Sequence, residues 1–281
     1  MLVDGDVGLN TAEFDNKIFT KEWLDENTTF AYPKNIIALD DFDKASGRFL
    51  DLPRGSYVWK PCYGRKSWGV ALVEKNIDGF KVYPSDEIMS SEDVVRELTR
   101  IKKLSISEVR EAGRFKKWFI EEWIYPHERF HKFTDDKRLP PIIRVCGRKK
   151  VHFVTLSPVY LNLSGIAPTG WKQRKYIWLD FDGVIIREED LNLKRASTLT
   201  RRIVPERSVE TPFYGEKIEG IRELVKQVNR EISPKLAFKA NRSWSVDGIF
   251  DKNNKFIVIE INKMAAPGFT GVTWKGKSRR L

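Results

Sequence analysis

The sequence predicts an α+β fold in which mainly antiparallel sheets are combined with helices. Short runs rich in β-branched and aromatic residues occur in pairs separated by turns, as at Trp244–Phe250 and Phe256–Asn262. Amphipathic segments with apolar residues at helical spacing lie between such pairs, as at Glu92–Lys103 and Glu216–Ile232. The length of 281 residues is enough for one large domain or for two lobes.

The composition favours anionic partners and a reducing compartment. Fifty Lys and Arg against 39 Asp and Glu give a net charge of +11, which suits a nucleotide, an acidic acceptor or a nucleic acid. No apolar run approaches the length of a membrane span, so we expect no membrane partner. The two cysteines, Cys62 and Cys146, have no metal-ligand spacing and only three histidines accompany them, which argues against zinc. We therefore expect a cytoplasmic protein, with the nucleus as the alternative.

The last pair of strands carries acidic residues at positions that would otherwise be buried. Alternation along the second strand places four residues on one face: Phe256, Val258, Glu260 and Asn262. If the loop is Lys252–Lys255, Asp247 of the first strand lies directly opposite Glu260 on that face. Two carboxylates and an amide oxygen would then converge, and Mg²⁺ prefers such ligands beside nucleotide phosphates. The alternative is an ordinary hairpin whose polar residues face water.

The same residues carry a family resemblance. The pattern of Asp247, an apolar run, Glu260-Ile-Asn262 and then Pro267-Gly268 resembles the C-terminal signature of the ATP-grasp superfamily, of which D-alanine–D-alanine ligase is an example. The resemblance implies that Asp247, Glu260 and Asn262 hold the Mg²⁺ (or Mn²⁺) that bridges the ATP phosphates. In this chain Lys263–Ala266 intervene before the Pro-Gly pair, which leaves the position of the acceptor-side loop open.

The start of the chain is similar to the lead-in of that family. A helix over Asn16–Glu26, a strand over Asn35–Leu39 and a helix over Asp40–Ser46 are expected. The family's nucleotide-contacting lysine would correspond to Lys17, with Lys21 as the rival. The alternative is that both are solvated helix lysines. Only Met1–Phe14 precede this point, so the family's usual N-terminal substrate domain is expected to be missing. The acceptor would then be bound by the C-terminal lobe, or a homodimer neighbour or a partner chain would complete the substrate site.

A basic loop follows the strand Tyr57–Pro61. The sequence from Cys62 to Val70 joins this strand to a second one ending at Lys75, and such a loop can aim backbone N–H groups and positive charge at phosphates. It does not match the P-loop pattern. It resembles the ATP-grasp segment in which a strand lysine contacts ATP and a loop covers the phosphates, which implies nucleotide-binding roles for Lys60, Lys66, Ser67 and Gly69. A plain Gly-containing turn on a basic protein is the alternative.

The strand Trp118–Ile124 resembles the hinge between the two ATP-grasp lobes. The resemblance implies that Glu121, Glu122 and Ile124 frame the adenine and that Glu128 meets the ribose hydroxyls. The alternative for the two acids is one buried and paired carboxylate beside one exposed carboxylate.

A hairpin is expected over Pro141–Pro158, with the turn at C-G-R-K-K. Family members place a cation for the transferred phosphate on such strands, and Arg144 is the candidate, with Lys60 as the second catalytic cation. We interpret His152 as a structural strand histidine.

Together these segments predict a two-lobed ATP-grasp fold with ATP held between the lobes. The expected divisions are a tail over 1–13, a lead-in over 14–55, a small lobe over 56–125, a large lobe over 126–271 and a basic tail over 272–281. The function that the resemblance implies is an ATP- and Mg²⁺-dependent ligase that joins a carboxylate to an amine through an acyl phosphate and acts on an acidic acceptor.

Two alternatives stay open. One is an ATP-grasp kinase of a polyanionic small molecule such as an inositol phosphate, because a basic site suits a polyphosphate. The other is a nucleic-acid-binding protein with an inert fold, since nine Trp among many Lys and Arg suit stacking and charge.

Overall fold

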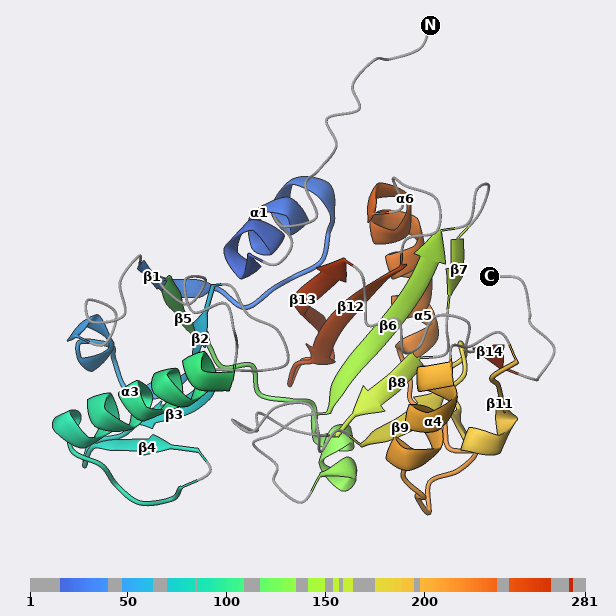
Figure 1. The fold of residues 1–281 in the computed structure, drawn as a ribbon. Coiled ribbons are helices and arrows are strands. Elements are labelled where there is room, and N and C mark those ends of the chain that lie inside the picture. Colours follow the sequence, from blue (N-terminus) through green and yellow to red (C-terminus); the bar gives the residue numbers. More distant parts are fainter. Residues whose placement is uncertain are drawn as a thin grey trace, which may run out of the picture.

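The computed structural model describes residues 16–39, 47–62, 70–83, 85–108, 117–134, 141–149, 154–156, 159–163, 175–194, 198–236, 243–263 and 273–274. These residues form two large antiparallel sheets, each with its own hydrophobic core, and a separate two-stranded pair, and helix α1 (Lys17–Asn27) lies between the two large sheets (Figure 1). The α+β class with two lobes is therefore confirmed. Within the described part of the chain, no helix is long and apolar enough to cross a membrane.

The small lobe is a five-stranded sheet covered on one face by a helix. Its strand order is β1-β5-β2-β3-β4, and every neighbouring pair is antiparallel. The elements are β1 (Asn35–Leu39), β2 (Gly55–Pro61), β3 (Ala71–Lys75), β4 (Phe80–Val82), α3 (Ser91–Glu108) and β5 (Trp118–Glu122). Val94, Leu98 and Ile101 of α3 pack on Trp59, Trp118 and other aromatic residues of the sheet. Because side chains alternate along a strand, Lys60 and Glu121 point to the face away from α3.

The large lobe is a seven-stranded sheet with helices against it. Its main strand order is β10-β9-β8-β6-β12-β13, and β7 pairs with β6. The strands are β6 (Ile142–Lys149), β7 (Val154–Leu156), β8 (Val159–Asn162), β9 (Tyr176–Leu179), β10 (Ile185–Ile186), β12 (Ser243–Phe250) and β13 (Phe256–Lys263). Helix α5 (Ile221–Gln227), a π-helical turn over Val228–Ile232 and α6 (Ser233–Leu236) follow one another and cover one face through Leu224, Val228 and Ile232.

Smaller elements complete this lobe. They are the 3₁₀ turns η3 (Glu128–Phe133) and η5 (Glu188–Asp190), helix α4 (Thr198–Arg207), and the pair β11 (Leu191–Asn192) with β14 (Thr273–Trp274). Val204 of α4 packs with Cys146 and Trp178 in a separate small core. Helix α1 adjoins the large sheet, since Ala31, which follows it, bridges to Ile257 of β13.

The β12–β13 hairpin brings Asp247 opposite Glu260, as the sequence predicts, but its loop is longer than expected and its strand register shifts once. Phe250 pairs with Phe256, so the loop is Asp251–Lys255 and not Lys252–Lys255. The Asp251 carboxylate accepts hydrogen bonds from the backbone N–H groups of Asn253 (3.0 Å) and Lys255 (2.8 Å), which fixes the longer loop. A β-bulge between Asp247 and Gly248 then restores the pairing.

The bulge also changes which residues share a face. Phe256, Val258 and Ile261 all pack in the core of the large lobe, so Glu260 and Asn262 lie on the opposite face. The expectation that all four residues Phe256, Val258, Glu260 and Asn262 share one face was therefore wrong. Strict alternation fails because a bulge inserts one residue without a cross-strand partner.

Three further boundaries differ from the sequence prediction. The expected helix Glu216–Ile232 begins only at Ile221, because Gly220 is left-handed (φ 83°) and Ile218 N–H bonds to Gly183 O at 2.8 Å. The first four residues of the expected turn at C-G-R-K-K are instead strand: β6 continues through Lys149, and Gly147 pairs with Leu156 of β7. The strand expected over Trp118–Ile124 ends at Glu122, two residues early.

The helices α1 and α3 lie where they were predicted, with α3 longer by five residues at its C-terminus. The expected helix over Asp40–Ser46 and His152 lie outside the described residues.

Candidate functional site

Three lysines from α1 and β2 lie buried on the face of the small sheet away from α3. Lys17 and Lys21 are one helical turn apart on α1, and Lys60 comes from β2. Their exposed fractions are 8%, 3% and 3%. Lysine is among the residues least often buried without a partner, so this cluster requires compensating negative charge.

Lys21 is fully engaged by protein groups. Its ammonium donates to Pro33 O (2.6 Å), Asn35 Oδ1 (2.5 Å) and Glu121 Oε2 (2.6 Å). An ammonium has only three N–H donors, so none is left for a ligand. Of the two rivals named by the sequence, Lys21 therefore has no N–H donor left for a nucleotide.

Glu121 is the counter-ion at the centre of this cluster. Its carboxylate is 2% exposed and forms ion pairs with both Lys21 and Lys60. The ring of Phe119 lies beside both lysines, with its centroid 5.2 Å from Lys21 Nζ and 5.1 Å from Lys60 Nζ. The side chain of Glu121 thus belongs to the lysine cluster. Glu121 is buried and paired and Glu122 is more exposed, which is the alternative arrangement that the sequence left open for these two acids.

Burial shifts the pKa values of Lys17 and Lys21 downward. Desolvation lowers the pKa of Lys21 to about 8, although Glu121 opposes the shift. Desolvation also lowers the pKa of Lys17, and the carboxylate of Glu260 is the largest opposing influence. Positive charge is therefore costly here, and an added anion would stabilise it.

The carboxylates of the hairpin lie on the face that the lysines approach. Asp247 is 4% exposed and takes a bidentate contact from Arg144 of β6, with Nε 2.5 Å from Oδ1 and Nη2 bonded to Oδ2. The strand register explains this pair, since Asp247 lies directly opposite Arg144 as well as opposite Glu260. Asn262 Nδ2 donates to Asp247 Oδ2 at 3.4 Å.

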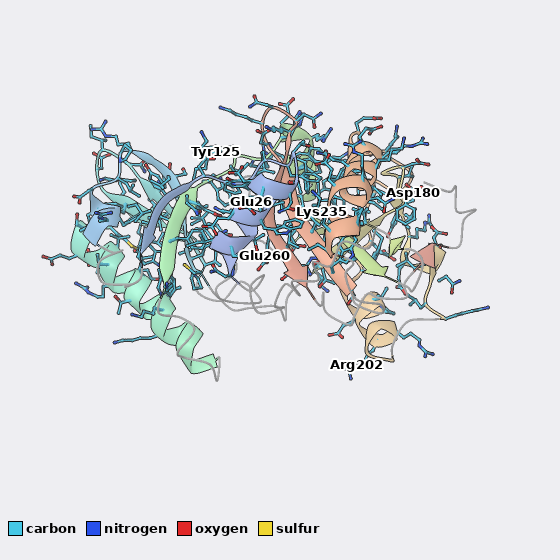
Figure 2. The ribbon with its side chains drawn as sticks, turned by 90° about the horizontal axis from the view of Figure 1, so that it is seen from above. Glu26, Tyr125, Asp180, Arg202, Lys235 and Glu260 are labelled. Carbon is cyan, nitrogen blue, oxygen red and sulfur yellow. The ribbon has the colours of Figure 1, made fainter. Side chains whose placement is uncertain are left out.

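Glu260 connects the two halves of the site. Lys17 Nζ lies 3.7 Å from Glu260 Oε1, and the Glu260 side chain keeps a quarter of its surface exposed. Figure 2 shows Glu260 near the middle of the molecule, whereas Asp180 and Arg202 lie on the far side of the large lobe. Residues from α1, β2, β5, β6, β12 and β13 therefore meet in one region, with four cations against three carboxylates.

The oxygen atoms on this face fit a hard divalent cation. Asp247, Glu260 and Asn262 supply two carboxylates and an amide, the donors that Mg²⁺ takes. The hydroxyl of Ser245, next along the same face of β12, is fully buried and has no hydrogen-bond partner within the described residues. In that part of the chain no group of three His, Cys, Asp or Glu gathers, so the set depends on the amide as its third ligand. Arg144 would have to share or release Asp247.

The hinge segment after β5 leaves backbone groups available. Trp123 N–H donates to Ser56 O, and His127 N–H donates to Phe250 O in the large lobe. Between them, the backbone N–H of Ile124 has no partner in the described part of the chain. Glu122 accepts from Lys34 N–H at 3.0 Å, and Glu128 is exposed at the start of η3.

Three of the expected nucleotide-binding residues, Lys66, Ser67 and Gly69, lie outside the described residues, as does the Pro267-Gly268 loop. Sequence reasoning missed the contacts of Lys21 with Glu121 and of Arg144 with Asp247, and it missed the buried Ser245. Only the alternation of Ser245 with Asp247 along the strand could have indicated Ser245.

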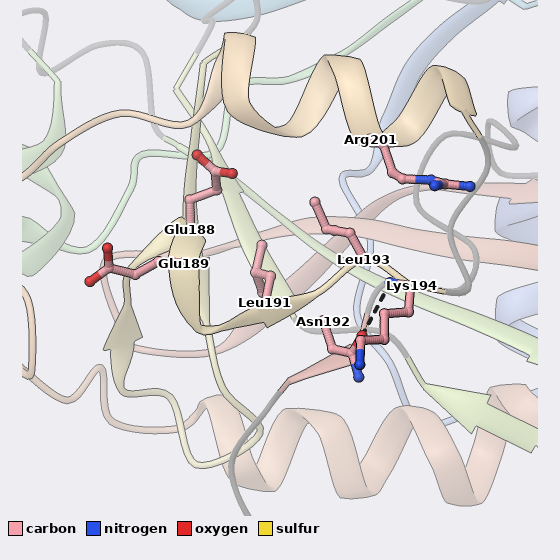
Figure 3. Close-up of a pocket in the computed structure, with 7 residues that line it drawn as sticks. All are labelled: Glu188, Glu189, Leu191, Asn192, Leu193, Lys194 and Arg201. Atoms are coloured by element: carbon pink, nitrogen blue, oxygen red, sulfur yellow. Dashed lines mark hydrogen bonds between the residues drawn. The ribbon is translucent and has the colours of Figure 1, made fainter.

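A separate cavity of about 550 Å³ lies in the large lobe between η5, β11 and α4 (Figure 3). It is lined by Glu188, Glu189, Leu191, Asn192, Leu193, Lys194 and Arg201. None of the residues that the sequence predicts to bind nucleotide or metal lines this cavity.

Structural comparison finds ligases and synthetases with similar arrangements. N5-carboxyaminoimidazole synthetase from Staphylococcus aureus, complexed with ADP, has 12% identity and a TM-score of 0.49 over 91% of this chain and 46% of its own. D-alanyl-alanine synthetase A from Vibrio cholerae has 13% identity and a TM-score of 0.49 over 94% and 58%. D-alanine–D-alanine ligase from Helicobacter pylori has 15% identity and a TM-score of 0.47 over 90% and 55%.

The chain therefore spans about half the length of the solved structures that it resembles. A likeness at this level concerns the arrangement of helices and strands and does not identify what the chain binds. No protein-family model and no curated protein sequence matches the chain.

Proposed function

We propose that the protein is an ATP-grasp enzyme that binds ATP with Mg²⁺ between its lobes and ligates a carboxylate to an amine. The observation that carries the proposal is the meeting of buried lysines from α1 and β2 with the carboxylates of the β12–β13 hairpin, joined by the Lys17–Glu260 contact at 3.7 Å. A polyphosphate with divalent cations suits such a site, because it offers negative charge to the lysines and positive charge to the carboxylates.

Each group has a distinct role in this proposal. Lys17 and Lys60 would bind phosphate oxygens, and Arg144 would stabilise the charge of the transferred phosphate. Asp247, Glu260 and Asn262 would hold the cation, with Ser245 beside them. When bound, Mg²⁺ would neutralise phosphate charge and orient the phosphates. Ile124 would offer its backbone N–H to the adenine, beside Glu122, and Glu128 would reach the ribose.

The ligase reaction needs no nucleophile from the protein. A substrate carboxylate oxygen would attack the γ-phosphorus and release ADP, giving an acyl phosphate. An amine would then attack the acyl carbon, lose its proton and release phosphate. The work left to the protein is positioning and charge stabilisation, which the buried cations supply. The net charge of +11 supports an acidic acceptor.

Product analysis tests the proposal. The protein is incubated with Mg²⁺, ATP and a Glu-rich peptide, with hydroxylamine present to trap an acyl phosphate as a hydroxamate. We expect ADP and hydroxamate to form together, and both to disappear in excess chelator. ADP released with a stable phosphate ester would indicate a kinase instead. ATP that is neither bound nor turned over would contradict the assignment and favour an inert fold.

A further inference from the structure

The buried carboxylate of Glu121 is shared between two lysines that come from different elements. Glu121 Oε2 lies 2.6 Å from Lys21 Nζ of α1, and Oε1 is paired with Lys60 of β2. All three side chains are at most 4% exposed, so water does not compensate their charges. Lys21 is also held by Pro33 O, on the segment between α1 and β1, and by Asn35 Oδ1 at the start of β1.

This sharing bears on how Lys60 can bind a phosphate. To reach a nucleotide, the Lys60 ammonium must turn away from Glu121 Oε1. If Lys60 were the only partner of Glu121, that movement would leave a buried carboxylate without a counter-ion, which is strongly unfavourable. Lys21 removes this obstacle, because its ammonium stays bonded to Glu121 Oε2 when Lys60 leaves. Two further acceptors, Pro33 O and Asn35 Oδ1, hold that ammonium in place.

We propose that Lys21 is a positioning residue that keeps Glu121 neutralised, so that Lys60 can leave Glu121 and engage the nucleotide phosphate. The inference rests on the proposed nucleotide site. It assigns Lys21 no contact with the ligand, since its three donors are used within the protein. Lys17, one turn earlier on α1, keeps its position beside Glu260.

The charge state of Lys21 makes the role testable by pH. The groups that face Lys21 are Lys60 from β2, Glu121 and Glu122 from β5, Asn35 from β1, and the rings of Tyr32 and Phe119, while Lys17 lies one turn earlier on the same helix. Desolvation lowers the pKa of Lys21 to about 8. Above that pH the neutral amine leaves Glu121 with Lys60 as its only cation, and Lys60 is held more tightly.

A double-mutant cycle on ADP binding in the presence of Mg²⁺ tests this. We expect Lys21→Met to weaken ADP binding by roughly tenfold or more. Adding Glu121→Gln to Lys21→Met should restore most of that loss, because no carboxylate then retains Lys60. A merely structural role for Lys21 predicts no rescue, since the second substitution removes yet another buried partner.

Lys75→Met is the matched control. The Lys75 ammonium donates to Leu50 O and Leu52 O, both at 2.5 Å, in the same lobe. Its loss should affect stability but not ADP affinity.

The pH dependence of ADP affinity tests the inference even if Lys21→Met fails to fold. ADP affinity of the wild type should fall as pH rises through about 8, and that of Lys21→Arg, which keeps its charge at position 21, should fall less. Equal pH profiles for these two proteins, or a double variant no better than Lys21→Met, would overturn the inference. Wild-type protein that binds no ADP at any pH would instead overturn the proposed function.

Discussion

At the residue scale, the Asp247 carboxylate contacts the guanidinium of Arg144 and is also a proposed ligand of the cation. Its carboxylate is almost fully buried and both oxygens contact Arg144. Removing one partner of a buried ion pair leaves an uncompensated charge and costs about 3–5 kcal/mol. A divalent cation bound at the same carboxylate would offset that cost.

We therefore expect Arg144→Gln to unfold more easily than the wild type in chelator and to regain much of the difference when Mg²⁺ or Mn²⁺ is added. A ligand that binds only the folded state stabilises it in proportion to the logarithm of its concentration. Thermal unfolding with and without the cation measures this. A metal-induced shift in Tm no larger than that of the wild type would show that Asp247 is not a ligand.

The cross-strand pairing of Asp247 with Glu260 could be predicted from the sequence, but the contacts of these acids with cations could not. Asp247 and Glu260 belong to one hairpin, so their pairing follows from local register. Arg144 and Asp247 are 103 residues apart, and the pair exists only because β6 and β12 are neighbours. The three acceptors of Lys21 likewise come from segments that sequence periodicity does not join.

At the element scale, the bulge in the β12–β13 hairpin sets the orientation of the carboxylates. The bulge requires a residue without a side chain at position 248, because a Cβ on Gly248 would lie 2.4 Å from Ile257 O and 2.4 Å from the Phe256 ring. With the longer Asp251–Lys255 loop and no bulge, Asp247 would oppose Ile259 instead of Glu260.

Gly248→Ala should destabilise the protein by about 1–3 kcal/mol, the usual range for overpacking a filled site. It should also weaken metal binding, because relief of the clash shifts the pairing of Asp247. Gly47→Ala is the control, since a Cβ there meets nothing within 4 Å. Urea unfolding and Mn²⁺ titration of both variants measure the two effects. A Gly248→Ala protein as stable as Gly47→Ala would refute this account of the bulge.

Elements fixed by local pattern were predicted well, and those fixed by distant contacts were not. Helix α3 follows from its apolar spacing and from Ser90, whose hydroxyl accepts from Asp93 N–H at 3.2 Å. The start of α5 was placed five residues early because the pattern does not reveal that Lys217 pairs with Val184 of a distant segment. Helix α4 was missed since its sequence is mostly polar and contains Pro205.

At the scale of the whole molecule, the lysine cluster links stability to pH. The folded pKa of Lys21, about 8, lies below its ordinary value of 10.5, so between these pH values the unfolded chain binds more protons. The free energy of unfolding should therefore rise with pH across this window. ADP affinity should fall over the same range, so stability and binding should change in opposite directions.

The difference in free energy of unfolding between the wild type and Lys21→Met separates the contribution of Lys21 from that of other groups that titrate in alkali. Relative to the variant, the wild type should gain up to about 3 kcal/mol between pH 8 and 10.5. Chemical denaturation at matched pH values measures the gain. A constant difference across the window would mean that Lys21 does not carry the lowered pKa.

The central claim is that Lys17 on α1 and Glu260 on β13 belong to a single nucleotide and metal site. The most direct test is ADP affinity as a function of Mg²⁺ for the wild type, Lys17→Met and Glu260→Gln. The wild type should bind roughly tenfold or more tightly with Mg²⁺ than in chelator. Glu260→Gln should fold normally but lose that dependence, and Lys17→Met should bind weakly under both conditions. Wild-type affinity that is unchanged by chelator, or full Mg²⁺ dependence in Glu260→Gln, would contradict the account.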